Sequence, residues 1–209
     1  MMIVDCQQGT PDWFAARAGV VTASMFSTAR DYKKNGDPSS KQLDYAMQVA
    51  VERIAGETIQ STYETWQMRR GSELEMEARS GHSFRLEKDI IEVGFVRSDC
   101  GRFGGSPDDL IDDDGGAEYK CPIGAGQLRK IFIELDKSDY LDQVQGNMWI
   151  TGRQWWELVI YCPFLSPAAR LFTVTRYDRD QKYIDDLAAD LEDFDKLVNE
   201  YKTTLEKGG

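Results

Sequence analysis

A short stretch near the middle of the chain holds two carboxylates and a lysine at a spacing that suits metal-dependent phosphate chemistry. Ser106-Pro107-Asp108 is followed, after nine intervening residues, by Glu118-Tyr119-Lys120. Carboxylate oxygens are the ligands that Mg²⁺ prefers, and a lysine can orient an attacking water or stabilise charge on a phosphate. Glu118 and Lys120 are two residues apart, so a strand would point both to one face. The pattern predicts a divalent-metal phosphodiesterase site.

A β-hairpin is predicted to carry these residues. The apolar-rich segment 103–111 leads into an Asp- and Gly-rich turn at 112–116, and 117–122 returns as the second strand. We interpret the acidic run Asp112, Asp113 and Asp114 as a solvated tip, because tight turns favour Asp and Gly. The Asp…Glu-X-Lys spacing is a weak indication by itself, since it recurs by chance in any acidic protein.

Length and composition favour one domain spanning residues 1–209. With 209 residues and 41% hydrophobic content, the chain can bury one substantial core. No apolar run approaches the roughly 20 residues that a membrane span needs, and the first six residues do not resemble a signal peptide. We therefore expect a cytoplasmic protein that does not contact a membrane.

The cysteines and the histidine argue against two common kinds of metal centre. Cys6, Cys100, Cys121 and Cys162 are widely scattered without a Cys-X-X-Cys pair, and His82 is the single histidine. This spacing excludes a zinc ribbon and disfavours an iron–sulfur cluster. We expect Cys121 to pack as a small apolar residue, and His82 to lie at a helix end or on the surface.

The charge balance limits how the protein can meet nucleic acid. The chain has 25 basic and 36 acidic residues, a net charge of −11, so it should not bind DNA indiscriminately. Much of the acidic excess lies from Asp178 onward, on what is predicted to be a solvated helical face. An acidic interaction protein, such as a nucleic-acid mimic, is therefore one alternative function. Basic residues that could line a groove are Arg17, Lys33, Lys34, Arg69, Arg70, Lys120, Arg129 and Lys130.

Hydrophobic periodicity predicts an α/β fold with a mixed central β-sheet flanked by helices. Helical spacing or capping signals indicate helices over 11–18, 22–29, 41–55, 64–80, 140–151 and 178–205, while 31–40 reads as a loop. Besides the hairpin, strands are predicted over 90–97, 155–162 and 169–177. The apolar stripe of the last helix, predicted to face the core, is Tyr183, Leu187, Leu191, Phe194 and Val198.

Four blocks in a fixed order give a resemblance to a known family. They are Arg17-Ala18-Gly19-Val20-Val21-Thr22-Ala23-Ser24; Gly71-Ser72-Glu73-Leu74-Glu75; Ser106-Pro107-Asp108-Asp109-Leu110 with Glu118-Tyr119-Lys120-Cys121-Pro122; and Tyr140-Leu141-Asp142-Gln143-Val144-Gln145-Gly146-Asn147-Met148-Trp149. In this order they resemble the phage lambda-type alkaline exonucleases, which are viral recombination nucleases of the PD-(D/E)XK superfamily. The resemblance covers most of the chain and implies a restriction-endonuclease-like core within a single nuclease domain, 1–209.

The resemblance also implies the roles of the catalytic residues. Asp108, Glu118, the backbone carbonyl of Tyr119 and Glu75 would hold Mg²⁺, with Mn²⁺ as the alternative metal. Lys120 would orient or help to deprotonate the attacking water. Gln145, and less surely Gln143, would hold that water or the scissile phosphate.

A second set of residues is implied at the DNA end. Arg17, Ser24 and Ser106 would bind a terminal 5′-phosphate, for which the planar donor fork of arginine is well suited. Trp13 and Met68 would form a wedge against the last base pairs, Met68 being placed only by its distance from Gly71. Arg69 and Arg70 stand where an apolar pair is expected in the family, so the wedge differs here.

The implied activity is 5′-to-3′ digestion of one strand of linear duplex DNA into 5′-mononucleotides. This would leave a 3′ overhang for a single-strand annealing protein, in the cytoplasm of a cell that hosts a phage or prophage. A homotrimeric ring around DNA is also implied. The alternative on the same fold is a restriction or nicking endonuclease, which would cut circular DNA and ignore the 5′ end.

Overall fold

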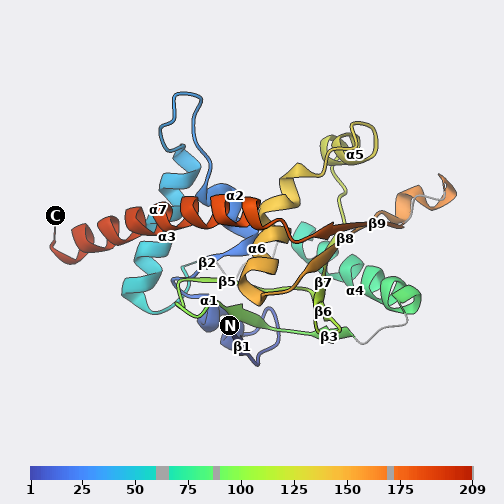
Figure 1. The fold of residues 1–209 in the computed structure, drawn as a ribbon, viewed down its shortest axis with the longest axis horizontal. Helices are drawn as coiled ribbons and strands as arrows, with labels where there is room; N and C mark the ends of the chain where they lie inside the picture. The colour runs from blue at the N-terminus through green and yellow to red at the C-terminus, as the bar shows by residue number, and fades with distance from the viewer. Residues whose placement is uncertain (60–65, 87–89, 169–171, 209) are drawn as a thin grey trace.

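Two mixed sheets form the centre of the protein in a computed structural model. The model describes residues 1–59, 66–86, 90–168 and 172–208. The side chains of residues 66–69, 71, 72, 167 and 168 are not described. The first sheet has the order β1 (Met2–Val4), β4 (Phe95–Arg97), β5 (Phe103–Gly105), β2 (Val21–Thr22). The second has the order β3 (Ile90–Glu92), β6 (Asp109–Ile111), β7 (Gly115–Lys120), β8 (Trp155–Tyr161), β9 (Phe172–Asp178). The β2–β5 and β7–β8 pairs are parallel and the other pairs are antiparallel. The predicted α/β class with a mixed sheet is therefore confirmed, divided into two sheets (Figure 1).

The chain passes from one sheet to the other inside two segments that the sequence presents as single strands. Segment 90–97 forms β3 and β4, and segment 103–111 forms β5 and β6. The prediction of one continuous strand in each segment is wrong. In the second segment the break falls at Pro107, which has no amide hydrogen with which to continue a ladder. Asp108 therefore lies in the bend between the sheets rather than within a strand.

The helices agree with most of the predicted ones. They are α1 (Pro11–Arg17), α2 (Phe26–Ala29), α3 (Ser40–Ala55), α4 (Trp66–Leu86), α5 (Ala125–Phe132), α6 (Leu141–Thr151) and α7 (Gln181–Glu206), with 3₁₀ turns at Ala23–Met25, Ser138–Tyr140 and Pro163–Ala168. The side chains of Thr10, Ser39 and Asp180 cap α1, α3 and α7 by accepting a backbone N–H. In the predicted helical segment 22–29, Thr22 ends β2 and is the N-cap residue of the 3₁₀ turn Ala23–Met25, which runs into α2. The first residues of the predicted helix 64–80 lie outside the described residues.

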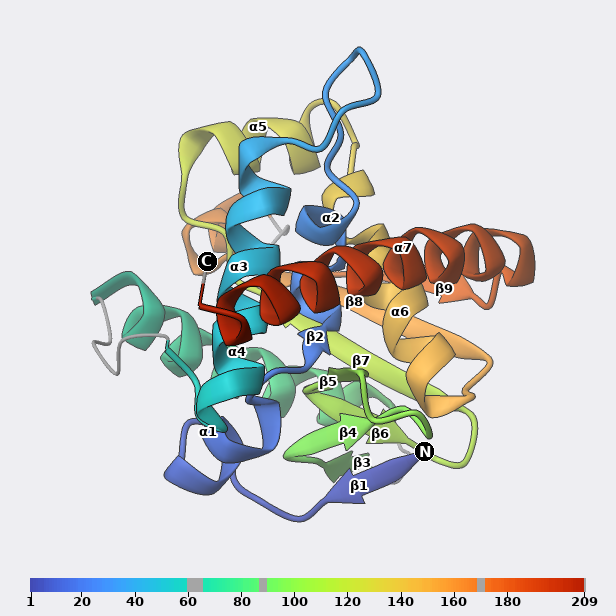
Figure 2. The same ribbon diagram turned by 90° about the vertical axis from the view of Figure 1, so that its left-hand side faces the viewer.

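The two faces of the five-stranded sheet are covered by different helices. On one face Ala78 of α4 packs with Ala117, Tyr119 and Val159. On the other face the apolar side chains of β8 pack against α6 and α7, and the stripe of Leu187, Leu191, Phe194 and Val198 is buried there, with Tyr183 partly buried. Figure 2 shows α7 crossing α3 at the outside of this layer. None of the described helices is both long and apolar enough to cross a membrane.

The acidic face of α7 does more than face solvent. Arg102 forms ion pairs with Glu192 and Asp195, and Arg53 of α3 pairs with the buried carboxylate of Asp195. The prediction of a purely solvated acidic face is therefore wrong for these carboxylates. They fasten α7 to α3 and to the loop before β5.

Gly146 sets how closely α6 approaches α2. A Cβ at this position would lie 2.5 Å from a ring carbon of Phe26, which is fully buried. The close approach matters because α6 also carries residues that face β7.

We expect Gly146→Ala to lower the free energy of unfolding by about 1–2 kcal/mol. Alanine favours a helix over glycine by about 1 kcal/mol, but overpacking against a buried ring costs about 1–3 kcal/mol. The matched control is Gly126→Ala in α5, where an added Cβ would have no neighbour within 4 Å. Chemical denaturation measures both, and an unchanged or raised stability for Gly146→Ala would contradict the packing argument.

Candidate active site

Glu118 lies at the centre of a cluster of polar side chains between β7 and α6. Its carboxylate accepts hydrogen bonds from Lys120 Nζ at 2.8 Å, from the side-chain amide of Gln143, and from Asn147 Nδ2 at 3.3 Å. Glu118 and Lys120 share a face of β7 as predicted, and α6 supplies the two amides. The carboxylate is nearly buried, so these donors replace the water that it would otherwise bind.

Asp108 is held beside Glu118 by the backbone of the next strand. Its Oδ2 accepts the amide hydrogen of Tyr119 at 2.7 Å. Burial, and after it the nearby carboxylate of Glu118, hold the pKa of Asp108 well above its usual range. The bend at Pro107 therefore brings two carboxylates together in a place where their negative charges repel each other.

Glu75 and Lys120 complete the charged cluster. Burial raises the pKa of Glu75, with Lys120 opposing the rise and Glu118 adding to it, so α4 brings this carboxylate within electrostatic reach of the hairpin. For Lys120, burial by itself would lower the pKa, but Glu118 and Asp108 outweigh it and the pKa is raised. Lys120 is accordingly a cation surrounded by three acidic groups.

The carboxylate oxygens of Asp108, Glu118 and Glu75 are of the kind that binds a divalent cation with a preference for oxygen ligands. The negative charge of Glu118 adds to the burial that raises the pKa of Asp108, and a bound cation would relieve this repulsion. No three side chains of His, Cys, Asp or Glu form a metal cage among the described residues. The set fits Mg²⁺ better than zinc, because Mg²⁺ keeps several waters and needs few protein ligands.

The structure separates the two glutamines that were expected to share a role. Gln143 contacts Glu118, whereas Gln145 donates to the carbonyl of Asp178 and accepts from the amide of Asp180. Gln145 therefore holds the junction between β9 and α7, while the role expected for it at the water or the scissile phosphate stays a prediction. Sequence reasoning also missed Asn147, although residues four apart on a helix share a face and Gln143 and Asn147 have this spacing.

Arg17, Trp13 and Ser106 form a second group next to the carboxylates. The Arg17 guanidinium lies 4.1 Å from the centre of the Trp13 ring, and the indole N–H donates to Ser106 Oγ at 2.8 Å. Burial lowers the pKa of Arg17, against smaller opposing effects from Tyr45 and Glu52. Within the described part of the chain, no carboxylate lies within ion-pair distance of this guanidinium. An unpaired, partly buried arginine is well placed to bind an anion.

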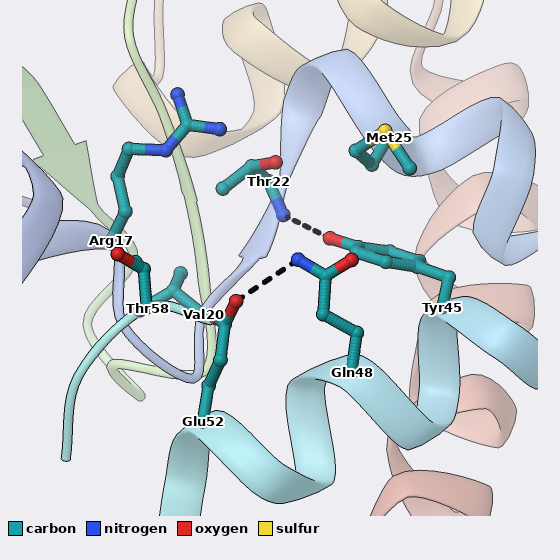
Figure 3. Close-up of a pocket in the computed structure, with 8 residues that line it drawn as sticks. All are labelled: Arg17, Val20, Thr22, Met25, Tyr45, Gln48, Glu52 and Thr58. Carbon is teal, nitrogen blue, oxygen red and sulfur yellow. Dashed lines mark hydrogen bonds between the residues drawn. The ribbon is translucent and has the colours of Figure 1, made fainter. Parts of the chain in front are cut away.

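Helix α3 holds the segment that follows Arg17, the last residue of α1. Figure 3 shows Arg17 above a small pocket lined by Thr22, Tyr45, Gln48 and Glu52. Glu52 accepts the amide hydrogen of Gly19 at 3.1 Å, and the Tyr45 hydroxyl accepts that of Thr22 at 3.1 Å. The backbone between Arg17 and Ser24 is thus tied to α3 at two points.

Ser24 shares a pocket with Lys120. It lies beside Thr22, with the two hydroxyl oxygens 3.4 Å apart, and lines an open pocket of about 340 Å³ together with Lys120, Tyr140 and Gln143. Of the three residues expected at a 5′-phosphate, Ser24 thus shares a pocket with Lys120, whereas Arg17 and Ser106 meet through Trp13.

The predicted end wedge is placed only in part. Trp13 is half-buried, with its indole engaged by Arg17 and Ser106. The side chain of Met68 lies outside the described residues. The wedge therefore stays a prediction, and the observed contacts of Trp13 are those of a residue that packs within the site.

The structure contradicts the predicted position of His82 and confirms that of Cys121. The expectation of a helix-terminal or surface position for His82 is wrong: it is 1% exposed, inside α4, and hydrogen-bonds to Tyr119 and Glu157. The spacing of Glu75, Arg79 and His82 is a signal that could have found it, because these positions share a helix face. Cys121 packs at the edge of the apolar cluster as expected, and burial raises its pKa to about 12, which keeps the thiol protonated.

Comparison with known proteins supports the resemblance. The YqaJ-like viral recombinase domain matches residues 12–154, about two thirds of the chain. The chain belongs to the YqaJ-like viral recombinase family. Within this family it is similar to the alkaline exonuclease LHK-Exo from Laribacter hongkongensis, with 31% identity, a TM-score of 0.81, and coverage of 95% of this chain and 97% of that one. The structure of LHK-Exo in complex with dAMP gives 32% identity, a TM-score of 0.82 and the same coverage.

A more distant relative shares the fold. The phage-related exonuclease from Haemophilus somnus 129PT has 15% identity and a TM-score of 0.68, covering 91% of this chain and 96% of that one. No curated protein is a significant match. The restriction-endonuclease-like fold and the viral-recombinase family expected from the four sequence blocks are confirmed.

We expect Asp108→Asn to raise the thermal midpoint of the metal-free protein by about 2–4 °C, equivalent to about 1 kcal/mol at this size. The neutral amide keeps the shape and the acceptor for Tyr119 N–H but removes the repulsion from Glu118. Adding Mn²⁺ should raise the midpoint of the wild type and leave that of the variant unchanged.

The control is Asp113→Asn, the same chemical change on the exposed hairpin turn. It should shift neither midpoint. A lower midpoint for Asp108→Asn in EDTA would contradict the proposed repulsion.

Proposed function

We propose that the protein is a metal-dependent exodeoxyribonuclease that digests one strand of linear duplex DNA from its 5′ end, releasing 5′-mononucleotides. The observation that carries the proposal is the presence of two groups of side chains: the Asp108–Glu118–Lys120 cluster, and Arg17 packed on Trp13, whose indole donates to Ser106. One can hydrolyse a phosphodiester and the other can bind a terminal phosphate. The family membership and the similarity to LHK-Exo support it. The proposal takes residues 1–209 as a single PD-(D/E)XK nuclease domain.

Asp108 and Glu118 would hold the metal, with the Tyr119 carbonyl as a further ligand and Glu75 contributing from α4. Mg²⁺ is proposed, with Mn²⁺ as the alternative. When bound, the cation would polarise the phosphoryl group and lower the pKa of a coordinated water.

The protein's own residues would align the attacking water. Lys120 Nζ lies 2.8 Å from Glu118 and borders the pocket that Gln143 and Ser24 also line. A cationic lysine there can donate to the water and to a non-bridging phosphate oxygen as negative charge develops on it. The amides of Gln143 and Asn147 would keep the Glu118 carboxylate in one orientation. The role of Gln145 at the water or the scissile phosphate stays a prediction, since its side chain hydrogen-bonds to the backbone of Asp178 and Asp180.

The 5′ end would be recognised by Arg17, Ser106 and Ser24. The Trp13 ring under the guanidinium and the ties from α3 to the loop limit the positions that Arg17 can take. A pre-organised arginine loses little entropy when it binds phosphate, so this group can select phosphorylated ends.

The wider setting is part of the same proposal. The 3′ overhang would be passed to a single-strand annealing protein in the cytoplasm of a host cell. A homotrimeric ring would keep a protein of net charge −11 on DNA by topology rather than by affinity. Light scattering tests the ring, and a monomer alone would remove it.

The first experiment is digestion of linear duplex DNA labelled on one strand, with Mg²⁺ or EDTA and with 5′-phosphate or 5′-hydroxyl ends. We expect Mg²⁺-dependent loss of the 5′-phosphorylated strand while its complement stays intact. Lys120→Ala should abolish this loss and keep DNA binding and folding.

Closed circular DNA separates the main alternative. Cutting of circles as fast as of linear DNA would favour a restriction or nicking endonuclease on this fold. Absence of cutting on any DNA, with Lys120→Ala indistinguishable from wild type, would favour an acidic interaction protein.

We expect Arg17→Ala to remove the preference for 5′-phosphorylated ends. Losing a charge-assisted hydrogen bond to phosphate costs about 1.5–3 kcal/mol, so the KM for phosphorylated ends should rise about 10- to 100-fold. The KM for hydroxyl ends should change little.

Arg129→Ala is the matched control, because Arg129 is exposed on α5 and pairs with Glu134. Steady-state kinetics on both kinds of end measure the effect. An unchanged phosphate preference in Arg17→Ala would remove Arg17 from the proposed pocket.

A further inference from the structure

A buried polar network lies on the face of β7 opposite to the charged cluster. Tyr119 is 1% exposed, Asp109 is 0% exposed and His82 is 1% exposed. The Tyr119 hydroxyl donates to Asp109 at 2.7 Å and lies 3.0 Å from His82 Nδ1, and His82 Nε2 lies 2.8 Å from Glu157. Buried polar groups destabilise a protein unless they are hydrogen-bonded. A series of four hydrogen-bonded side chains in an otherwise apolar layer therefore calls for a physical reason.

The network is connected to Asp108 by two routes. The backbone amide of Tyr119 donates to the Asp108 carboxylate at 2.7 Å, while the side chain of the same residue is held in the network. Arg79 donates from Nε to the Asp109 carboxylate at 3.1 Å and from Nη2 to the Asp108 carbonyl at 2.8 Å. The carboxylate and the backbone carbonyl of Asp108 are thus both oriented by residues that belong to the network or bond to it.

The direction of the hydrogen bonds gives the phenol its role. Because the Tyr119 hydroxyl has one proton and gives it to Asp109, it accepts from His82 Nδ1. Removing the hydroxyl takes one hydrogen-bond partner from each of Asp109 and His82, which keep Arg79 and Glu157 respectively, and it frees the Tyr119 ring to shift within its layer. Any such shift moves the Tyr119 backbone, which carries both the amide on Asp108 and the carbonyl proposed to face the metal.

We propose that Tyr119, held through its hydroxyl by Asp109 and His82, is a positioning residue that sets the affinity of the Asp108–Glu118 site for a divalent cation. This inference rests on the proposed function, since it concerns the same metal site. The alternation of β7 carries the effect: the side chain fixes the strand from one face, and the cation would be held on the other.

The test is Tyr119→Phe, which keeps the ring and removes the two hydrogen bonds. Partners of metal-binding residues typically contribute 10- to 100-fold to metal affinity, so we expect Mn²⁺ binding to the DNA-free protein to weaken about 10-fold, measured by electron paramagnetic resonance. The Mg²⁺ concentration for half-maximal digestion should rise by a similar factor. The affinity for a 5′-phosphorylated duplex in EDTA, measured by fluorescence anisotropy, should stay within about twofold of wild type.

Tyr161→Phe is the matched control, because the Tyr161 hydroxyl donates to Glu77 at 2.7 Å on an exposed part of the same sheet. It should leave Mn²⁺ binding unchanged. His82→Gln is the second variant, expected to weaken Mn²⁺ binding in the same direction as Tyr119→Phe, and it keeps the test informative if one of the two variants fails to fold.

Unchanged Mn²⁺ binding in folded Tyr119→Phe would overturn the inference. So would equal losses of Mn²⁺ binding and DNA-end binding, because that pattern indicates general damage to the fold. Failure of the proposed function is distinguishable: wild-type protein would then show no Mg²⁺-dependent digestion, while the comparison of Mn²⁺ binding between the variants could still be made.

Discussion

The alternation of side chains along β7 is the constraint on which the site depends. Glu118 and Lys120 point toward α6, and Tyr119 between them points toward α4. One strand therefore separates a charged face from a buried face by the thickness of its backbone. A shift of one residue in the pairing of β7 with β8 would exchange the two faces. Gly115 and Gly116 help to fix the register, because any side chain there would collide with the rings of Trp155 and Trp156.

The charged face stores unfavourable electrostatic energy that a ligand can release. Asp108, Glu118 and Glu75 are brought together with a single lysine, and burial deprives them of water. Arrangements of this kind cost stability in the free protein and are retained where binding of a cation offsets the cost. The surrounding structure holds these side chains in place. Gly146 lets α6 pack closely against Phe26, and the ion pair of Arg53 with the buried carboxylate of Asp195 holds α7 against α3.

The two groups of candidate site residues come from different parts of the fold. Arg17 ends α1 and leads into β2 of the four-stranded sheet, whereas Lys120 belongs to β7 of the five-stranded sheet. One of the two segments that join the sheets is Ser106-Pro107-Asp108, which contributes a residue to each group. This short bend therefore links the two groups, and its proline restricts its conformations.

The sequence by itself determined the family, the α/β class and most helix positions, and it indicated Asp108, Glu118, Lys120 and Arg17 as candidate site residues, because these inferences follow from local spacing and ordered motifs. It presented segments 90–97 and 103–111 as single strands, since periodicity cannot show that a chain changes sheets. Only the tertiary structure decided that Gln143 rather than Gln145 meets Glu118, and that His82 is buried behind the site. Those outcomes depend on which faces of α6 and α4 lie against β7, and long-range packing fixes these faces where the spacing of residues along the chain does not.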